Sequence, residues 1–274
     1  MKIMPQVLLC DSFGTTYEIS KIFNQGIRRV YVRLHQLEKI AETVRSCTNC
    51  KLCETRTNAV PGKGNFAADV IFVGEAPGRN EDIHGEPFVG AAGKRLDAIL
   101  ADTGIDRKDV YITNIVKCRP PSNRIPSKEE ELACIDFINQ EIEIIAPKII
   151  CVMGNTAYGT LLGGKEITKN HGKIIEKDGK KFFITFHPAA TIYNQNLIYE
   201  LKKDFKKLAE FLRESGVEKQ YEERRCDFCM MKTRHEIVVI PKIVTRKRKW
   251  LFKCTKCNHE RWLQPYRTVA ESLY

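Results

Sequence analysis

The cysteines of this chain are the residues whose spacing most directly indicates chemistry. Near the C-terminus, Cys226 and Cys229 form one pair and Cys254 and Cys257 another, with two residues inside each pair and 24 residues between the pairs. Four thiolates at this spacing are typical of a tetrahedral structural zinc site. His259 lies close by, but the set of four cysteines is complete without it. We therefore predict a zinc ribbon in which the intervening segment EIVVIPKIVTRKRKWLFK forms a β-ribbon.

A second set of cysteines lies in the first half of the chain. Its members are Cys47, Cys50, Cys118 and Cys134. Cys47 and Cys50 are again separated by two residues, and folding could bring Cys118 and Cys134 next to them. The residues alone explain Cys118 and Cys134 equally well as buried free thiols, which pack as small hydrophobic side chains. Cys53 is an alternative ligand, whereas Cys10 and Cys151 look isolated.

Eleven cysteines without a signal peptide favour metal sites over disulfides, because reducing compartments keep thiols free. The N-terminal stretch MKIMPQVLLC has too short an apolar run for a secretory signal, and no run approaches the roughly 18–20 apolar residues of a membrane span. With 43% hydrophobic and 29% charged residues, the composition is that of an ordinary globular protein. We expect a cytoplasmic protein that does not contact a membrane.

The formal net charge of +11 is concentrated near the C-terminus, where residues 218–274 hold fourteen Lys or Arg against seven Asp or Glu. Such a basic region suits a polyanionic partner such as nucleic acid, but basic surfaces are as often only solubilising. Arg246, Lys247, Arg248 and Lys249 stand beside Trp250, which would allow phosphate contact together with base stacking. A solvated basic face explains the same run without any ligand.

Alternating strand and helix patterns from residue 69 onward predict an α/β fold. Short apolar runs (DVIFVG, VYITNIVKC, KIICVMG, KKFFITF) alternate with amphipathic stretches (RLDAILADTG, KEEELACIDFINQEIEIIA, YELKKDFKKLAEFLRESG). Ser127 and Glu130 form a capping box at the start of the second amphipathic stretch, and Pro147 marks its end. The continuous apolar strands favour a parallel sheet that is covered on both faces.

Because domains typically hold roughly 100–200 residues, a chain of 274 residues suits one large domain and a small appendage. Residues 34–44 space their apolar side chains like a helix, whereas residues 1–35 are assigned to an N-terminal extension of unknown role. We place the α/β domain at residues 36–216 and the zinc ribbon at residues 217–274. Ligands bind beyond the carboxyl ends of parallel strands, so the loops GEAPGRNEDIHGEPFVGAAG, KCRPPSNRIPS and HPAATIYNQN are expected to converge there.

Several motifs occur together in one order: CTNC with LCETRTNAVPGKG, GEAPGRNED with GEPFVGAAGKRL, TNIVKCRPPSNR, and ITFHPA. In these motifs the chain from about Cys47 to Gly216 resembles the family 4 uracil-DNA glycosylases, an iron-sulfur group found in thermophilic archaea and bacteria. The resemblance implies a three-layer α/β/α sandwich with a parallel central sheet. It also implies a structural 4Fe-4S cluster held by Cys47, Cys50, Cys118 and Cys134. The implied activity is hydrolysis of the N-glycosidic bond of deoxyuridine in DNA, which starts base excision repair.

Three side chains have the chemistry that uracil excision needs once the nucleotide is flipped out of the helix. Phe88 would pack against the uracil ring, as the resemblance implies, although an isolated phenylalanine is more simply explained by core packing. Asn114 would read the base edge, because its amide offers a donor to O4 and an acceptor for N3–H. His187 would donate a hydrogen bond to O2 of the leaving uracil anion. Backbone N–H groups of Ala76 and its neighbours would complete the binding site for this anion.

The carboxylate that positions the attacking water is left open by the sequence. The best-known uracil glycosylases carry an aspartate where this chain has Ala76. Glu75 and Glu81 remain in the loop, with Asp82 and Glu86 nearby. The resemblance favours Glu75 and Glu81 as functional carboxylates and Asn123 as a supporting polar group.

The loop after His187 departs from the family pattern, in which a leucine pair and an arginine follow HPA. This chain has ATIY there, so Ile192 or Tyr193 would fill the gap left by the flipped base. The segment NRIPS contains Pro126 and no insertion, so the covalent trapping of DNA that a related group performs is not expected.

Two other functions fit parts of the sequence. One is a glycosylase of broader specificity that removes hypoxanthine or other deaminated bases. The other is a non-catalytic nucleic-acid-binding protein with a zinc ribbon, which the joint presence of Phe88, Asn114 and His187 argues against. We expect a monomer that acts on single- or double-stranded uracil-containing DNA, associates with the nucleoid in a prokaryote, and contacts repair or replication proteins through its ribbon.

Overall fold

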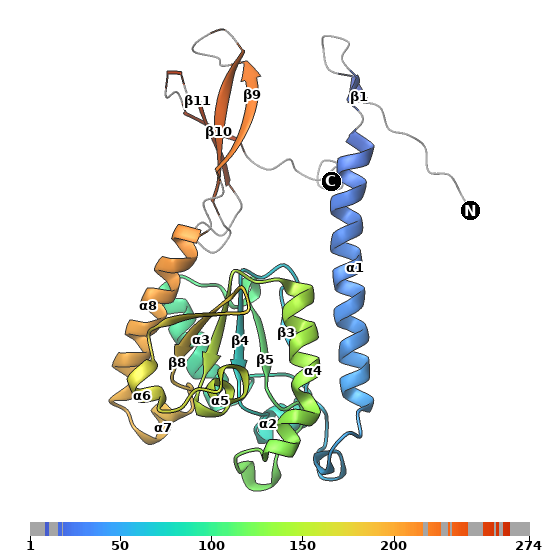
Figure 1. Cartoon of the computed structure of the whole chain (residues 1–274), viewed down its shortest axis with the longest axis vertical. Coiled ribbons are helices and arrows are strands. Elements are labelled where there is room, and N and C mark those ends of the chain that lie inside the picture. The colour runs from blue at the N-terminus through green and yellow to red at the C-terminus, as the bar shows by residue number, and fades with distance from the viewer. Residues whose placement is uncertain are drawn as a thin grey trace, which may run out of the picture.

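A computed structural model describes residues 19–215 as one continuous segment (Figure 1). Outside this segment the structure describes residues 9–10, 16–17, 219–225, 230, 232–240, 249–254, 256–257 and 260–263. Side chains are described for residues 32–215 and for residues 230, 254, 256 and 257. Within these parts of the chain, no helix is both long enough and apolar enough to cross a membrane.

A six-stranded sheet forms the centre of the fold, with the strand order β3-β5-β4-β6-β8-β7. Its strands are β3 (Lys63–Gly64), β4 (Val70–Gly74), β5 (Tyr111–Asn114), β6 (Ile149–Met153), β7 (Ile174–Lys177) and β8 (Lys180–Thr185). The four inner strands, β5, β4, β6 and β8, are parallel, and every residue of β4, β5 and β6 is buried. Burial on both faces explains why β4 and β6 are continuous apolar runs rather than alternating ones.

The prediction of a parallel sheet is correct for these inner strands and wrong for the edges, where β3 and β7 run antiparallel to their neighbours. β7 and β8 form a hairpin, and both residues of its turn, Asp178 and Gly179, have positive φ. Asp-Gly is a strong sequence signal for this kind of two-residue turn. The edge strand β7 was therefore predictable from the sequence.

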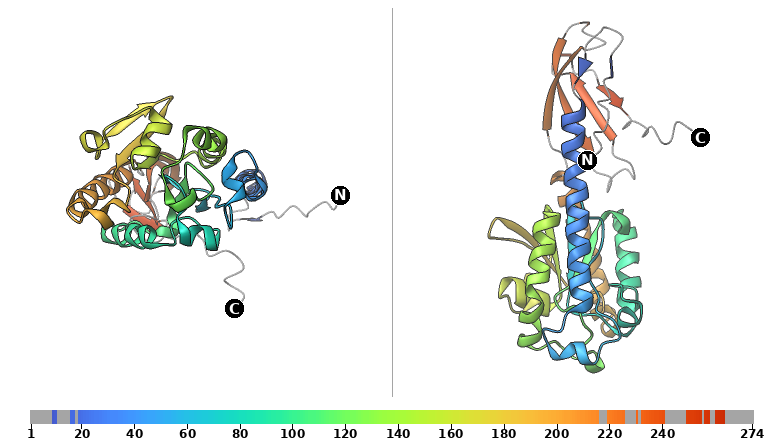
Figure 2. Two further views of the ribbon diagram at one scale, coloured as in Figure 1. Left: turned by 90° about the horizontal axis from the view of Figure 1, so that it is seen from below. Right: turned by 90° about the vertical axis from the view of Figure 1, so that its right-hand side faces the viewer.

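Helices cover both faces of the sheet and produce three layers (Figure 2). They are α1 (Ile19–Ser46), α2 (Arg79–His84), α3 (Ala91–Thr103), α4 (Lys128–Ile145), α5 (Asn155–Leu162), α6 (Ile167–Asn170), α7 (Ala190–Tyr193) and α8 (Leu197–Ser215). The loops between these elements contain short 3-10 helices, namely η1 (Lys51–Glu54), η2 (Arg107–Asp109) and η3 (Pro121–Asn123). α3 and α8 pack together on one face, whereas α4 and α5 lie on the other, with α1 beside α4. The α/β fold class inferred from the sequence is confirmed.

Helix α4 begins at the predicted capping box. The Ser127 hydroxyl accepts the Glu130 N–H at 3.3 Å, and the Ser127 N–H donates to the Glu130 carboxylate at 2.8 Å. A cap of this kind stabilises a helix by about 1 kcal/mol, because it satisfies N–H groups that have no partner inside the helix. Arg124 forms two further hydrogen bonds to the same carboxylate, at 2.6 and 2.8 Å. The cap therefore also anchors the loop that precedes α4.

Helix α1 is much longer than the predicted helix over residues 34–44. It runs from Ile19 to Ser46 and crosses the boundary that we placed between residues 35 and 36. Where its side chains are described, Ile40 and Val44 are buried against the domain, whereas Val32 and Leu34 are exposed. A continuous helix thus joins the N-terminal extension to the α/β domain.

Strands are also described toward both ends of the chain. β1 (Leu9–Cys10) pairs with β2 (Thr16–Tyr17), and β9 (Lys219–Arg225), β10 (Lys232–Ile240), β11 (Lys249–Cys254) and β12 (Glu260–Leu263) form an antiparallel sheet. β10 and β11 pair with one another and contain the two ends of the segment predicted to be a β-ribbon, residues 236–240 and 249–253. Cys254 is buried at the end of β11, whereas Cys226, Cys229, His259 and residues 246–248 lie outside the described residues. The zinc site and the basic run stay predictions.

Candidate active site

The loops that follow β4, β5 and β8 surround a cavity of about 440 Å³. It lies beyond the carboxyl ends of the parallel strands, where ligands of such sheets bind. All seven residues predicted to form the site line it: Glu75, Ala76, Glu81, Phe88, Asn114, Asn123 and His187. Parallel topology thus brings together positions that are far apart in the sequence.

Asn114 and His187 each present one polar atom without a partner to this cavity. Among the described residues, Asn114 Oδ1 and His187 Nε2 are the buried side-chain atoms that accept or donate no hydrogen bond. Asn114 is only 2% exposed at the end of β5. Leaving a buried polar group unpaired costs about 1–3 kcal/mol. Two such atoms on one cavity indicate a ligand that supplies their hydrogen-bond partners.

The hydrogen bond on the other side of the His187 ring fixes where its proton lies. The Ala189 N–H donates to His187 Nδ1 at 3.2 Å. Because Nδ1 is an acceptor, the neutral ring carries its proton on Nε2. Burial lowers the pKa of His187 to about 4, since loss of water disfavours the charged ring. At neutral pH the cavity therefore faces a neutral N–H donor.

Phe88 forms a wall of the same cavity and is 5% exposed. Its ring centroid lies 5.6 Å from that of His187, with the two planes tilted by 33°. Its φ of 55° is in the left-handed region, which is unfavourable for a bulky residue. Two glycines leave room for it: a Cβ on Gly74 would lie 2.7 Å from Phe88 Cζ, and one on Gly93 would lie 1.8 Å from the Phe88 carbonyl oxygen. The surrounding structure therefore imposes this ring position.

Two carboxylates of the first loop hold the backbone. Both oxygens of Glu81 accept N–H groups, from Gly78 at 3.1 Å and from Gly90 at 2.7 Å. One oxygen of Asp82 accepts the Thr57 N–H at 2.8 Å. The backbone of the loop thus uses both oxygens of Glu81, whereas Asp82 does not line the cavity.

Glu75 differs from the other acidic residues of the loop. Its Oε2 accepts a hydrogen bond from the Thr156 hydroxyl, while Oε1 has no partner within the described part of the chain. Glu86, in contrast, pairs with Lys63 at 2.5 Å. Of the carboxylates considered from the sequence, Glu75 is thus the one that lines the cavity with an oxygen available to a water molecule.

A second, small cavity is lined by several cysteines, namely Cys47, Cys50, Cys53, Cys118 and Cys134. Arg56 Nη1 donates to Cys118 Sγ at 3.0 Å, and the Asn49 N–H donates to Cys47 Sγ at 3.5 Å. Hydrogen bonds to sulfur are a feature of iron-sulfur sites. In residues 32–215, no three Cys, His, Asp or Glu side chains meet around one point closely enough for a single metal ion. Cysteine thiolates are the ligand type that an iron-sulfur cluster takes, and four of these five are the ones that the sequence motifs single out.

Comparison with known proteins identifies the family. The sequence profile of the uracil DNA glycosylase superfamily matches residues 61–214, which contain every residue of the first cavity. The chain belongs to this superfamily. The resemblance seen in the sequence motifs is therefore confirmed.

Three proteins that are similar to this chain carry the name Type-4 uracil-DNA glycosylase. The protein of Sulfurisphaera tokodaii is 46% identical over 189 residues, covering 65% of this chain and 85% of the relative. That of Archaeoglobus fulgidus is 45% identical over 186 residues, covering 65% and 94%. That of Thermotoga maritima is 44% identical over 194 residues, covering 68% and 100%.

The sequence analysis did not predict a buried ion pair between Lys117 and Glu141. Lys117 Nζ lies 2.8 Å from Glu141 Oε2, and both side chains are about 1% exposed. Lys117 also donates to the Thr113 hydroxyl at 2.5 Å, and the Gly62 N–H donates to Glu141 Oε1 at 3.1 Å. The network ties α4 to β5 next to Asn114. Removing one partner of such a pair costs about 3–5 kcal/mol, because the other charge stays buried.

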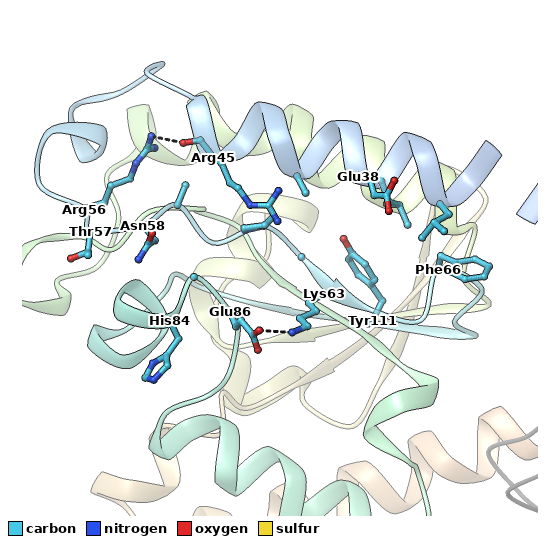
Figure 3. A pocket seen from close by; sticks show the side chains of 18 of the residues that line it. Glu38, Arg45, Arg56, Thr57, Asn58, Lys63, Phe66, His84, Glu86 and Tyr111 are labelled. Carbon is cyan, nitrogen blue, oxygen red and sulfur yellow. Dashed lines mark hydrogen bonds and ion pairs between the residues drawn. The ribbon is translucent and has the colours of Figure 1, made fainter. Parts of the chain in front are cut away.

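The glycosylase domain contains a further cavity of about 940 Å³ between α1, residues 53–66 and the turn at Gly85 (Figure 3). None of the predicted site residues lines it. Lys63 and Glu86 pair along its wall, and Arg56 Nη2 donates to the Arg45 carbonyl oxygen at 3.1 Å. Within the described residues it presents no buried polar side-chain atom without a partner. The unpaired groups that indicate a ligand lie in the first cavity.

Proposed function

We propose that this protein is a uracil-DNA glycosylase, which hydrolyses the N-glycosidic bond of deoxyuridine in DNA and so starts base excision repair. The observation that carries the proposal is the pair of unpaired atoms, Asn114 Oδ1 and His187 Nε2, in one cavity beside Phe88. Uracil offers a donor at N3 and acceptors at O2 and O4, which complement these atoms. The name shared by the relatives supports the same substrate.

Asn114 selects the base. Its Oδ1 accepts the N3–H of uracil, and its amide nitrogen donates to O4. Cytosine has no proton on N3 and carries an amino group in place of O4, so both contacts would be mismatched. A buried polar group that faces the wrong partner costs about 1–3 kcal/mol, enough for roughly 10- to 100-fold discrimination.

His187 stabilises the leaving group. When the bond between C1′ and N1 breaks, its electron pair goes to uracil and negative charge develops on O2. The Nε2–H of the neutral ring donates to that oxygen, and this bond strengthens as the charge develops, so it stabilises the transition state more than the bound substrate. Phe88 holds the flipped ring by stacking, and backbone N–H groups near Ala76 face the same anion.

Water then attacks the C1′ cation left by the departing uracil, and the proton that it loses is returned through solvent to the uracil anion. We assign Glu75 Oε1 to orient this water, because Glu81 already uses both oxygens to hold the loop. Asn123 supports the opposite rim, where its Oδ1 accepts the Arg119 Nε–H at 2.7 Å. Tyr193 also lines the cavity and is 90% exposed, which suits the side chain that fills the space left by the flipped base.

We assign Cys47, Cys50, Cys118 and Cys134 as ligands of a 4Fe-4S cluster. They come from the end of α1, the loop after β5 and the second turn of α4. When bound, the cluster ties these three segments together, which is a structural role. Arg56, Asn49 and the buried Lys117 line the same cavity as these cysteines.

We assign Cys226, Cys229, Cys254 and Cys257 to a structural zinc ion in residues 217–274, and catalysis to residues 36–216. The basic ribbon would contact DNA phosphates or a repair partner.

Metal analysis distinguishes the two sites. Anaerobically purified protein is expected to contain roughly four iron atoms and one zinc atom per chain. Cys118→Ser is expected to lose iron and keep zinc, whereas Cys254→Ser should show the opposite. Equal loss of both metals in either variant would contradict two separate sites.

Arg56 is expected to stabilise the cluster through its hydrogen bond to Cys118 Sγ. Arg56→Gln should lose visible cluster absorbance several-fold faster under a chelator, and its reduction potential should fall, because a positive donor favours the more negative reduced state. Lys51→Gln, a nearby exposed position, is the control. An unchanged potential in Arg56→Gln would argue against this contact.

The activity is tested by single-turnover excision on labelled oligonucleotides that carry one uracil, hypoxanthine, cytosine or thymine. Strand cleavage after alkali is expected for uracil alone. Cleavage at hypoxanthine but not uracil would support the broader-specificity glycosylase instead. If cluster-loaded protein binds DNA but produces no abasic site from any base, a non-catalytic nucleic-acid-binding protein becomes the better interpretation.

A further inference from the structure

Arg107 binds the backbone on both sides of Phe88 without lining the cavity. Its Nη2 donates to the carbonyl oxygens of Pro87 and Phe88, each at 3.1 Å. Its Nη1 donates to Asp97 Oδ1 at 2.5 Å. Arg107 lies in η2 and Asp97 in α3, so one guanidinium connects three segments.

These two carbonyl groups belong to the peptide planes that flank Phe88. Their relative orientation is set by φ and ψ of that residue, so binding both oxygens to one guanidinium restrains both dihedral angles. A bulky residue rarely adopts the φ of 55° found here and needs its surroundings to keep it there. The planar guanidinium donates both of these bonds from Nη2 while Nη1 is held by Asp97, a fixed arrangement that the flexible lysine ammonium does not reproduce.

Other contacts hold the loop at different places. Glu81 binds the Gly90 N–H, two residues beyond Phe88. Glu86 pairs with Lys63 at a site where both side chains are largely exposed, and such pairs contribute little. Within residues 32–215, Arg107 is the side chain that bonds to the Phe88 backbone itself.

We propose that Arg107 is a positioning residue, which holds the Phe88 backbone and so places its ring for stacking on the flipped uracil, and that Asp97 orients its guanidinium. The inference rests on the proposed function, since it assigns the stacking role to Phe88. It adds a positioning residue that does not touch the substrate.

The test compares Arg107→Gln and Arg107→Lys with Lys108→Gln, which removes a neighbouring charge whose side chain is 70% exposed and pairs with Asp106. Arg107→Gln is expected to lower the single-turnover rate about 10-fold or more and to weaken inhibition by free uracil by a similar factor. Arg107→Lys should be intermediate and Lys108→Gln unchanged. Binding to DNA with an abasic analogue, which has no base to stack, should be the same in all.

A double-mutant cycle with Phe88→Ala shows whether Arg107 acts through the ring. Once the ring is gone, Arg107→Gln should have little further effect. A folded Arg107→Gln with wild-type rate, an equal further loss in the Phe88→Ala background, or an equal loss of abasic-DNA binding would each overturn the proposal. If Arg107→Gln does not fold, Asp97→Asn gives the same comparison with an expected loss of about 3-fold. Failure of wild-type protein to excise uracil would instead refute the proposed function.

Discussion

Replacing His187 with alanine is expected to lower the single-turnover rate of uracil excision about 100-fold or more. The ring presents its Nε2 proton to the cavity, because Nδ1 already accepts the Ala189 N–H. In the variant, charge on O2 of the leaving uracil would develop without this donor. The effect should appear in the chemical step, and binding of uracil-containing DNA should change much less, because the bond strengthens only as the charge forms. His84→Ala is a matched control, since His84 lies outside this cavity.

The pH dependence of the wild-type rate tests the same assignment. Burial lowers the pKa of His187 to about 4, so the ring stays neutral across the physiological range. The rate should show no inflection from His187 between about pH 8 and pH 5 and should fall as the pH approaches 4, where a proton on Nδ1 would break the bond from Ala189. An inflection near pH 6.5 that disappears in His187→Ala would show an exposed, ordinary histidine and contradict the neutral-donor mechanism.

The sequence was sufficient to predict most of the cavity. Asn114 ends strand β5 and His187 follows strand β8, and parallel strands bring such positions to one edge of the sheet. The capping box at Ser127 was likewise readable, because its two hydrogen bonds join residues that are three positions apart. Signals between residues that are close in the sequence can be recognised without knowledge of the tertiary structure.

The side chains that support the cavity were not predictable. Arg107 contacts carbonyl oxygens of residues about twenty positions earlier in the chain. Every residue has a carbonyl oxygen, so the sequence does not indicate which of them a side chain binds. Lys117 pairs with Glu141 on another element, and a lysine near a loop is normally read as exposed. Glu81 has the residue type of a catalytic base, yet only the structure shows that both of its oxygens bind backbone N–H groups.

Replacing Asn114 is expected to change the choice of base as well as the rate. Asn114→Ala removes both contacts to the base edge and should lower uracil excision about 100-fold. Asn114→Asp keeps an acceptor but loses the donor to O4, and it adds a negative charge next to the leaving anion. An acidic side chain can accept from the amino group of cytosine, so the ratio of uracil to cytosine excision should narrow. Asn65→Ala, at a position outside the cavity, is the control.

The ratio of uracil to cytosine excision distinguishes loss of base recognition from loss of packing, which the absolute rate does not. A general loss of packing would reduce excision of both bases together, whereas loss of a specific hydrogen bond reduces the preferred base more. Asn114 Oδ1 is buried and lacks a partner, and a Cβ on Gly74 would lie 2.4 Å from it, so only glycine at residue 74 leaves room for it in this position. If Asn114→Ala and Asn114→Asp both retain the wild-type ratio of uracil to cytosine excision, the base must be read by backbone groups of the loops instead.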